Sequence, residues 1–208
     1  MTRAKPAPIV VHPLTTARFA DLEALFAQRG CAVARGCWCM YYRERGATTP
    51  ERGKTVAQSR KRALVRLCDA GPPPGLVAYR AGEPVGWVTL GPREDFLRLE
   101  RSTVMKAVDE RPAWSIVCFV VPSAHRRQGV TDALLAAAVD YAREQGATLV
   151  EGYPCDRAVR GHADASWFGS KSLFDRAGFA EVARRRPDRP FVRLELARPA
   201  RKRAARAR

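Results

Sequence analysis

The stretch over residues 114–121, WSIVCFVV, constrains the fold of this chain more than any other segment. A short, almost entirely apolar run rich in β-branched and aromatic residues is typical of a strand buried on both faces of a sheet. The polar loop HRRQG follows at residues 125–129, and a helix is predicted over residues 131–144. The apolar residues at helical spacing there are Val130, Leu134, Leu135, Ala138, Val139 and Ala142. Strand, polar loop and helix in this order predict an α/β fold.

The flanking segments extend this pattern in both directions. Alternation and β-branched content predict strands, and apolar spacing with end signals predicts helices. The expected order is strand, two helices, three strands, helix, strand, helix and two strands, which implies one mixed α/β sheet in two or three layers. Strands are expected over residues 7–14, 76–80, 85–90, 114–121, 147–154, 180–185 and 190–196, and the other helices over 15–30, 55–69 and within 166–179.

Length and charge narrow the class of protein. At 208 residues with 46% hydrophobic content, the chain is expected to form one domain over residues 1–197. It shows no signal-peptide core and no apolar run of membrane-spanning length, so we expect a cytoplasmic protein without a membrane partner. The net charge is +16, and six of these charges lie in residues 198–208, which we expect to be a disordered basic tail. The remaining surplus favours anionic ligands.

The loop over residues 126–130, RRQGV, has the chemistry of an anion site. A helix N-terminus presents backbone N–H groups without helical partners, and the helix dipole adds partial positive charge there. Arg126 and Arg127 add full charge, and Gly129 lets an anion approach the backbone. Neither a P-loop nor a G-x-G-x-x-G motif is present. The predicted ligand is a phosphate or diphosphate; the alternative is a charged connection with a glycine for the turn.

The motif and its position together resemble a known family. Residues 126–131, RRQGVT, are similar to the R/Q-x-x-G-x-G/A signature of the GNAT family of N-acetyltransferases. The resemblance covers about residues 8–196, and SLFDRAGF resembles the closing helix of the family. The segments CWCMYYR, VGWVTLGPRED and VEGYPCD look like those of a bacterial branch.

The resemblance implies a fold and a co-substrate. The implied fold is a mostly antiparallel sheet, splayed between two central parallel strands and flanked by helices. Acetyl-CoA is the implied acetyl donor, with its pantetheine arm along the motif strand and its thioester in the cleft between the splayed strands. A backbone N–H near Phe119 would then polarise the acetyl carbonyl. The implied cofactor-binding residues are Phe119, Val121, Arg126, Arg127, Gln128, Gly129, Val130 and Thr131.

Two departures from the family pattern concern catalysis. Thr131 replaces the usual small residue at the end of the motif, where its methyl would crowd the cofactor or its hydroxyl would bind a phosphate. Phe174 stands where many members carry the tyrosine that protonates the leaving thiolate. Ser170, Ser172 and Tyr153 are candidate substitutes by residue type, although a serine on a short helix is usually solvated or capping.

A base is also needed, because an amine with a pKa of about 10.4 is mostly protonated at neutral pH. Glu151 is the candidate if its side chain faces the cleft, and an outward-facing glutamate is the alternative. For His125 a role in supporting the loop is favoured over catalysis, and His162 is a further candidate on a substrate loop.

The six cysteines are expected to be reduced. For Cys31, Cys37 and Cys39 we weigh a soft-metal site, a reactive or redox pair, and aromatic-flanked packing; packing is favoured and no metal is expected. The aromatic residues of CWCMYY and the connection over residues 94–110 are where an acceptor pocket is expected.

Three functions follow from these patterns. The favoured one is an enzyme that transfers acetyl directly from acetyl-CoA to a primary amine of a small molecule or protein. The alternatives are an impaired, acyl-CoA-binding regulatory module and a basic protein that binds nucleic acid or the ribosome, for which the tail is the main evidence. The sequence identifies neither the acceptor nor the oligomeric state, and a homodimer is among the options.

Overall fold

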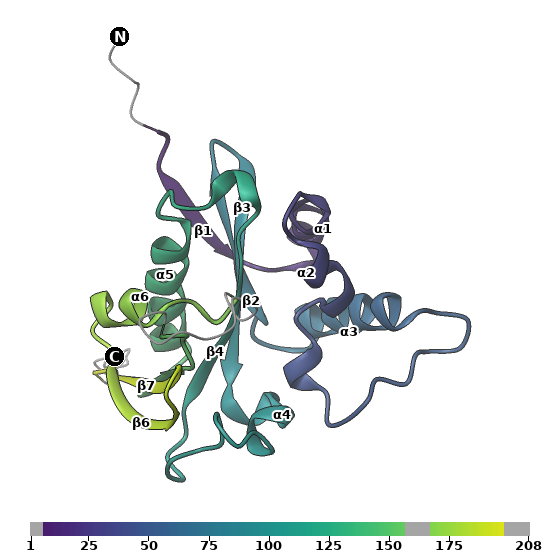
Figure 1. Ribbon diagram of the computed structural model, residues 1–208. Helices are drawn as coiled ribbons and strands as arrows, with labels where there is room; N and C mark the ends of the chain where they lie inside the picture. Colours follow the sequence, from purple (N-terminus) through teal and green to yellow (C-terminus); the bar gives the residue numbers. More distant parts are fainter. Residues whose placement is uncertain (1–5, 157–166, 198–208) are drawn as a thin grey trace, which may run out of the picture.

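The computed structural model describes residues 6–156 and 167–197, so the basic tail and His162 lie outside the described residues. The chain forms a seven-stranded sheet in the order β1-β2-β3-β4-β5-β7-β6 (Figure 1). The strands are β1 (Ile9–Pro13), β2 (Gly75–Arg80), β3 (Glu83–Pro92), β4 (Trp114–Val120), β5 (Leu149–Gly152), β6 (Ala180–Arg186) and β7 (Arg189–Glu195). Neighbouring strands are antiparallel except β4 and β5, which are parallel. This is the mixed sheet that the sequence predicts.

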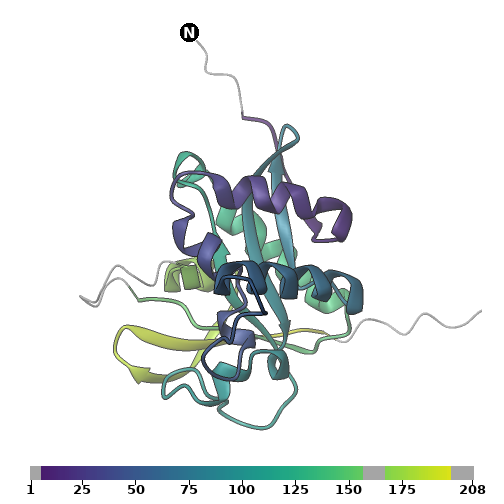
Figure 2. The same cartoon turned by 90° about the vertical axis from the view of Figure 1, so that its right-hand side faces the viewer.

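Helices cover both faces of the sheet. In Figure 1, α5 and α6 lie on one side of the sheet and α1, α2 and α3 on the other. Figure 2 looks onto the second side, where α1 and α3 lie across the strands. The α-helices are α1 (Phe19–Ala27), α2 (Ala32–Cys37), α3 (Val56–Ala70), α4 (Leu97–Glu100), α5 (Val130–Glu144) and α6 (Lys171–Arg176). Among the described helices, none has the length and apolar character needed to cross a bilayer.

Apolar side chains of α5 form the core on its side of the sheet. All six residues of its predicted stripe are buried, and they pack on β2, β3 and β4 in one cluster. At the opposite face, Phe26 of α1 packs edge-on against Trp87 of β3, with ring centroids 6.5 Å apart. Two filled interfaces therefore hold the sheet in place, so the open edge of β4 described below is set by a rigid framework.

Local signals explain most helix ends. Thr55 and Gln58 form a capping box at the start of α3, with the Gln58 N–H donating to Thr55 Oγ1 at 3.2 Å. After α5 and α6, Gly146 and Gly178 adopt positive φ angles of 85° and 82°, which suit glycine after a helix C-terminus.

The short helix α2 is absent from the predicted order, whereas α4 lies in the connection that was expected to be partly helical around residues 96–106. With six residues, α2 is too short to show an apolar period. Packing holds its helical turns, because α2 contacts both α1 and α3, and Ala34 belongs to the same buried cluster as Phe26. This difference matters for the site, because α2 forms one of its walls.

Candidate active site

The two parallel strands separate partway along β4. Their ladder has three pairs, and the last joins Ile116 of β4 to Gly152 of β5. β5 ends there, whereas β4 continues to Val120 while paired with β3 on its other edge. Beyond Ile116, the β5-facing edge of β4 therefore has no strand partner among the described residues. The predicted splay between the two central parallel strands is confirmed.

A β-bulge lies at the same point of β4. Thr89 of β3 faces Cys118 and the next residue, Leu90, faces Ile116, so Val117 is the extra residue. A bulge bends its strand and increases the local twist. The bulge thus lies directly after the last pair with β5, at the start of the part of β4 that β5 leaves unpaired.

The loop between β4 and α5 presents free amides. Backbone N–H groups of residues 126–132 donate no hydrogen bond to any residue that the structure describes. Ala133 is the first residue of α5 whose N–H is paired, with the Gly129 carbonyl at 3.0 Å. Gly129 has a φ of 78° and Arg127 a φ of 59°, so both curve the loop through left-handed backbone. This curved run of donors at a helix N-terminus is typical of an anion site.

Side chains of the loop hold it in this conformation. Arg126 donates through Nε to the Val121 carbonyl at 3.1 Å. Gln128 donates to the Ala124 carbonyl at 2.7 Å and accepts from Arg80, which also contacts the Gln128 carbonyl at 2.9 Å. Gln128 thus braces the loop, and Arg127 is left exposed without a side-chain partner among the described residues.

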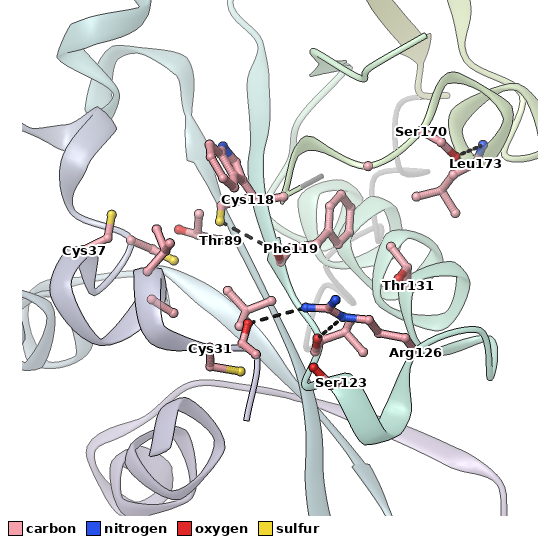
Figure 3. A pocket seen from close by; sticks show the side chains of 18 of the residues that line it. Cys31, Cys37, Thr89, Cys118, Phe119, Ser123, Arg126, Thr131, Ser170 and Leu173 are labelled. Carbon is pink, nitrogen blue, oxygen red and sulfur yellow. Dashed lines mark hydrogen bonds between the residues drawn. The ribbon is translucent and has the colours of Figure 1, made fainter. Parts of the chain in front are cut away.

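A cleft of about 1340 Å³ connects this loop to the splay. Its lining comes from both faces of the sheet, because Phe119 and Leu173 belong to the cluster under α5 whereas Cys31 belongs to the cluster under α1 (Figure 3). The cleft therefore runs across the free edge of β4. Lining residues used below are Cys37, Tyr41, Tyr42, Arg60, Thr89, Cys118, Val121, Arg126, Arg127, Thr131, Asp132, Trp167, Ser170 and Arg176.

The structure brings together five of the eight residues predicted to bind the cofactor. Phe119, Val121, Arg126, Arg127 and Thr131 line the cleft. The other three do not line it. Gln128 braces the loop, Gly129 caps α5, and the Val130 side chain is buried in the core beneath the helix.

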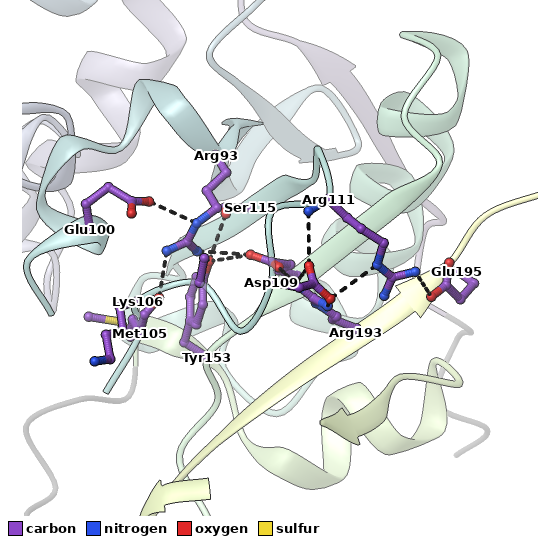
Figure 4. Close-up of polar contacts among 12 residues, drawn as sticks. Arg93, Glu100, Met105, Lys106, Asp109, Arg111, Ser115, Tyr153, Arg193 and Glu195 are labelled. Carbon is purple, nitrogen blue, oxygen red and sulfur yellow. Dashed lines mark hydrogen bonds and ion pairs between the residues drawn. The ribbon is translucent and has the colours of Figure 1, made fainter. Parts of the chain in front are cut away.

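Glu151 does not line the cleft, contrary to the prediction for a base. Its side chain is fully buried and is hydrogen-bonded to Arg93 and Arg193, the two arginines labelled in Figure 4. Arg93 donates to Glu151 Oε2 at 3.0 Å, and Arg193 donates to Oε1 at 2.9 Å and 2.7 Å. A carboxylate held by two guanidinium groups in the interior is suited to joining strands rather than to accepting a proton from a substrate.

Tyr153 lies in the same buried cluster rather than in the cleft. Its hydroxyl is 2.7 Å from Arg93 Nη1, 2.8 Å from Ser115 Oγ and 3.1 Å from Glu151 Oε2. Burial, together with the Glu151 charge, raises the pKa of Tyr153 above its usual value. The hydroxyl therefore has its partners within the protein, and the structure gives no support to a proton-donor role for it.

The serines of α6 differ in position. Ser170 lines the cleft and caps α6, accepting from the Leu173 N–H at 3.3 Å. Ser172 is exposed and lies outside the lining, and its Oγ is 3.1 Å from Ser170 Oγ. Ser170 is thus the one predicted proton donor that the structure places in the cleft.

Phe174 is fully buried beneath the splay. Its ring packs against Phe119 and Phe179, with centroids 6.3 Å and 5.0 Å apart. A Cβ on Gly152 would come within 2.3 Å of the ring. Phe174 thus fills the space under the point where β5 ends. The sequence shows only that Phe174 replaces the family tyrosine and does not reveal this packing role.

The remaining predictions concern histidines, cysteines and the acceptor pocket. His125 ends a short 3₁₀ turn and is outside the lining. Of the aromatic residues of CWCMYY, Tyr41 and Tyr42 line the cleft whereas Trp38 and residues 94–110 do not. Cys37 and Cys39 also belong to the lining. Within the described residues, no group of three histidine, cysteine or acidic side chains is placed to hold a metal ion. The cysteines are free thiols.

Sequence reasoning missed lining residues from distant segments. Thr89, Trp167 and Arg176 reach the cleft from β3, from the turn before α6 and from α6. No motif marks them, because only the folded sheet brings these segments to the free edge of β4.

Comparisons with known proteins agree with this geometry. A sequence profile of the Acetyltransferase (GNAT) family matches residues 38–160, more than half of the chain. Among curated proteins no sequence matches significantly.

Solved structures show the same fold at low identity. The chain is similar to a ribosomal-protein-alanine N-acetyltransferase from Brucella melitensis (TM-score 0.50, 21% identity, 90% of this chain and 99% of that chain). A polyamine N-acetyltransferase from Drosophila melanogaster gives a TM-score of 0.50 at 16% identity over 91% and 100% of the two chains. An acetyltransferase of the GNAT family from Streptococcus pneumoniae gives 0.50 at 11% identity, over 91% and 100%.

Proposed function

The chain belongs to the acetyltransferase (GNAT) family, and from this premise we propose that it transfers an acetyl group from acetyl-CoA directly to a primary amine. The observation that carries the proposal is the junction of two features in one cleft: the run of free amides before α5 and the free edge of β4. The first suits a diphosphate and the second suits an amide-containing arm that pairs with a strand edge.

The lining residues fit acetyl-CoA by their chemistry. The N–H groups of residues 126–132 would take the diphosphate, with Arg126 and Arg127 adding charge. The backbone of Phe119 and Val121 would pair with the pantetheine arm along the free edge. Acetyl-CoA supplies the activated thioester. Beside it, a backbone N–H near Phe119 would stabilise the charge that develops on the acetyl oxygen.

The acceptor side of the cleft is aromatic and carries little acid. Tyr41, Tyr42 and Trp167 line it, and the single carboxylate of the described lining is Asp132. Asp132 lies at the start of α5 and pairs with Arg176 at 2.6 Å. We therefore propose that the proton of the acceptor amine leaves through water in the open cleft rather than to a buried carboxylate.

The test is turnover with a panel of amines. Purified protein is incubated with acetyl-CoA and each amine, and free CoA and acetylated amine are quantified by chromatography, which avoids the thiols of the protein itself. Stoichiometric formation of both products with one class of amine supports the proposal. Cofactor binding in calorimetry without turnover on any amine contradicts it.

Cofactor binding without turnover would favour the alternative of an impaired acyl-CoA-binding module. One observation supports this alternative. Phe174, at the position of the family tyrosine, is fully buried and has no proton to donate. Ser170 is the remaining candidate for the proton donor, so a variant of Ser170 tests whether the cleft contains one. Ser170→Asn keeps a helix-capping side chain but removes the hydroxyl, and Ser172→Ala is the matched control outside the cleft. A loss of kcat in the first variant alone assigns proton donation to Ser170.

The alternative of nucleic-acid binding rests chiefly on the basic composition of residues 198–208, which lie outside the described residues. Deletion of residues 198–208 tests this alternative separately from acetyl transfer. If polyanion binding weakens on deletion and on addition of salt, the binding belongs to the tail.

A further inference from the structure

One wall of the cleft is left for the acceptor once the proposed cofactor is placed. The loop before α5, the start of α5 and α6 supply the lining around the proposed diphosphate site, whereas α2, the 3₁₀ turn Tyr41–Arg43 and α3 supply another part. Figure 3 shows Cys37 of this second part on the left and Thr131 and Ser170 on the right. We call the second part the acceptor wall, formed by Gly36, Cys37, Tyr41, Tyr42 and Arg60.

The acceptor wall offers aromatic surface to a ligand. Tyr41 is 42% exposed, and its ring packs edge-on against Tyr42 with centroids 5.0 Å apart. Tyr42 packs in the same way against Phe168, at 5.6 Å, and the neighbouring Trp167 also lines the cleft. The rings thus continue from the acceptor wall to the turn before α6. Such a surface suits a flat apolar group of a ligand.

Arg60 is the charged residue of the acceptor wall. Its Nε and Nη2 each donate to the Glu44 carboxylate at 2.7 Å, and its Nη1 donates to the Gly36 carbonyl at 3.3 Å. Nη1 carries two N–H groups, so one of them has no acceptor among the described residues. A guanidinium N–H that remains available beside a cleft is suited to a carboxylate of a ligand.

The charge behind the acceptor wall favours the same kind of ligand. The second guanidinium near Glu44 belongs to Arg98, which is 3.9 Å from the carboxylate and 4.1 Å above the ring of Tyr41. Two guanidinium groups and one carboxylate leave a net charge of +1 there. The single carboxylate of the described lining, Asp132, is already paired with Arg176. A polycationic acceptor would therefore meet repulsion and no free counter-charge.

We propose that the acceptor is a small molecule that carries an aromatic ring and a carboxylate besides its primary amine, the chemistry of an aromatic amino acid. The ring packs on the tyrosines of the acceptor wall, and the carboxylate accepts from Arg60. The neutral amine attacks the acetyl carbonyl carbon, a C–N bond forms and the C–S bond breaks. The proton that the amine loses to water is balanced by the one that the CoA thiolate gains. This inference rests on the proposed function.

The first test compares four acceptors at one concentration of acetyl-CoA. Phenylalanine carries all three groups, phenylalanine amide lacks the carboxylate, alanine lacks the ring, and spermidine is a polycation. Values of kcat/KM are expressed per concentration of neutral amine, because amidation changes the pKa of the amine. We expect phenylalanine to exceed each of the others by about 10-fold or more, which is the ratio that one hydrogen bond to a charged group produces. Equal or faster turnover of spermidine or of the amide overturns the proposal.

The second test removes the guanidinium together with its partner. Arg60→Met/Glu44→Gln deletes the ion pair without leaving a carboxylate unpaired. We expect the KM for phenylalanine to rise about 10-fold and the KM for phenylalanine amide to stay unchanged. The control is Arg62→Met, because Arg62 lies on the same helix outside the lining and pairs with Glu51 at 3.1 Å. An equal rise for both acceptors would indicate a structural role and overturn the assignment of Arg60.

A binding measurement separates failure of this inference from failure of the proposed function. Phenylalanine is titrated calorimetrically into protein saturated with CoA, and we expect binding that weakens in Arg60→Met/Glu44→Gln but not in Arg62→Met. Turnover of spermidine alone overturns the inference and keeps the proposed function. Turnover of no amine contradicts the proposed function, and the titration then still tests the acceptor wall: absence of phenylalanine binding overturns the inference.

Discussion

Ile116 and Gly152 form the last pair between the two parallel strands, and the cleft opens directly beyond this pair. On one side of this pair, Glu151 of β5 is hydrogen-bonded to Arg93 and to Arg193 of β7, which together form a buried ionic cluster. On the other, Phe174 fills the space below Gly152. The opening is therefore a consequence of packing and charge at its base, and the residues there are suited to mutation.

Gly152→Ala tests the packing at this point. The added methyl would meet the Phe174 ring at 2.3 Å, and the ring is fully buried and cannot move aside freely. Overpacking of this kind costs about 1–3 kcal/mol. We expect that loss in the free energy of unfolding by urea titration, with part of it recovered in Gly152→Ala/Phe174→Leu.

The control for this variant is Gly36→Ala. Gly36 lies in a helix, and a Cβ there would meet nothing within 4 Å. Alanine is expected to leave stability unchanged or to raise it slightly. Equal effects of the two substitutions would show that Phe174 does not fill the space under the splay.

Glu151→Gln tests the ionic cluster. The substitution leaves the guanidinium groups of Arg93 and Arg193 buried without their shared carboxylate. Removing one partner from a buried ion pair costs about 3–5 kcal/mol. Glu195→Gln is the matched control, because Glu195 is exposed and pairs with the exposed Arg111; such pairs contribute about 0–1 kcal/mol. If Glu151 were the catalytic base instead, Glu151→Gln would abolish turnover while stability stayed near that of the control.

The contribution of Asp109, which pairs with Arg193 of the ionic cluster, makes the stability of the protein depend on pH. Two hydrogen bonds from Arg193, at 2.6 Å and 2.9 Å, hold the pKa of Asp109 well below its usual range. A carboxyl group whose pKa is lower in the folded state stabilises the protein above its unfolded pKa of about 3.9, and the contribution is lost as the pH falls through the folded value.

We therefore expect Asp109→Asn to destabilise the chain near neutral pH and to matter progressively less below about pH 4. Urea unfolding of both proteins across this range measures the difference. A difference that stays constant with pH would contradict the assigned ion pair.

Gly129→Glu tests the anion site at the loop. Gly129 has a φ of 78°, and a Cβ there meets nothing within 4 Å, so the side chain adds charge and backbone strain without a clash. We expect CoA binding to be lost in calorimetry while the fold is retained. Gly146→Glu, at the other end of α5, carries the same charge change at a φ of 85° in equally open space. Loss of binding in both variants would assign the effect to strain or net charge rather than to the loop.

Long periodic segments carried most of the information on the fold. The apolar run over residues 114–121 predicted β4, and the apolar residues at helical spacing after residue 129 predicted α5. The resemblance at residues 126–131 placed the loop between them. The helix α2 was not predictable, because six residues without an apolar period owe their conformation to packing on α1 and α3.

The side chain of Glu151 shows why catalytic residues were harder to predict. Its strand was assigned correctly, but its face depends on Arg93 and Arg193, which are 58 and 42 residues away in the chain. Pairings of this range leave no local signal.

The most direct measurement is a crystal structure of the chain with acetyl-CoA. We expect diphosphate oxygens within about 2.7–3.2 Å of backbone nitrogens in residues 126–132, and the thioester between β4 and the end of β5. A diphosphate bound elsewhere, with these nitrogens facing solvent and the thioester outside the splay, would contradict the account.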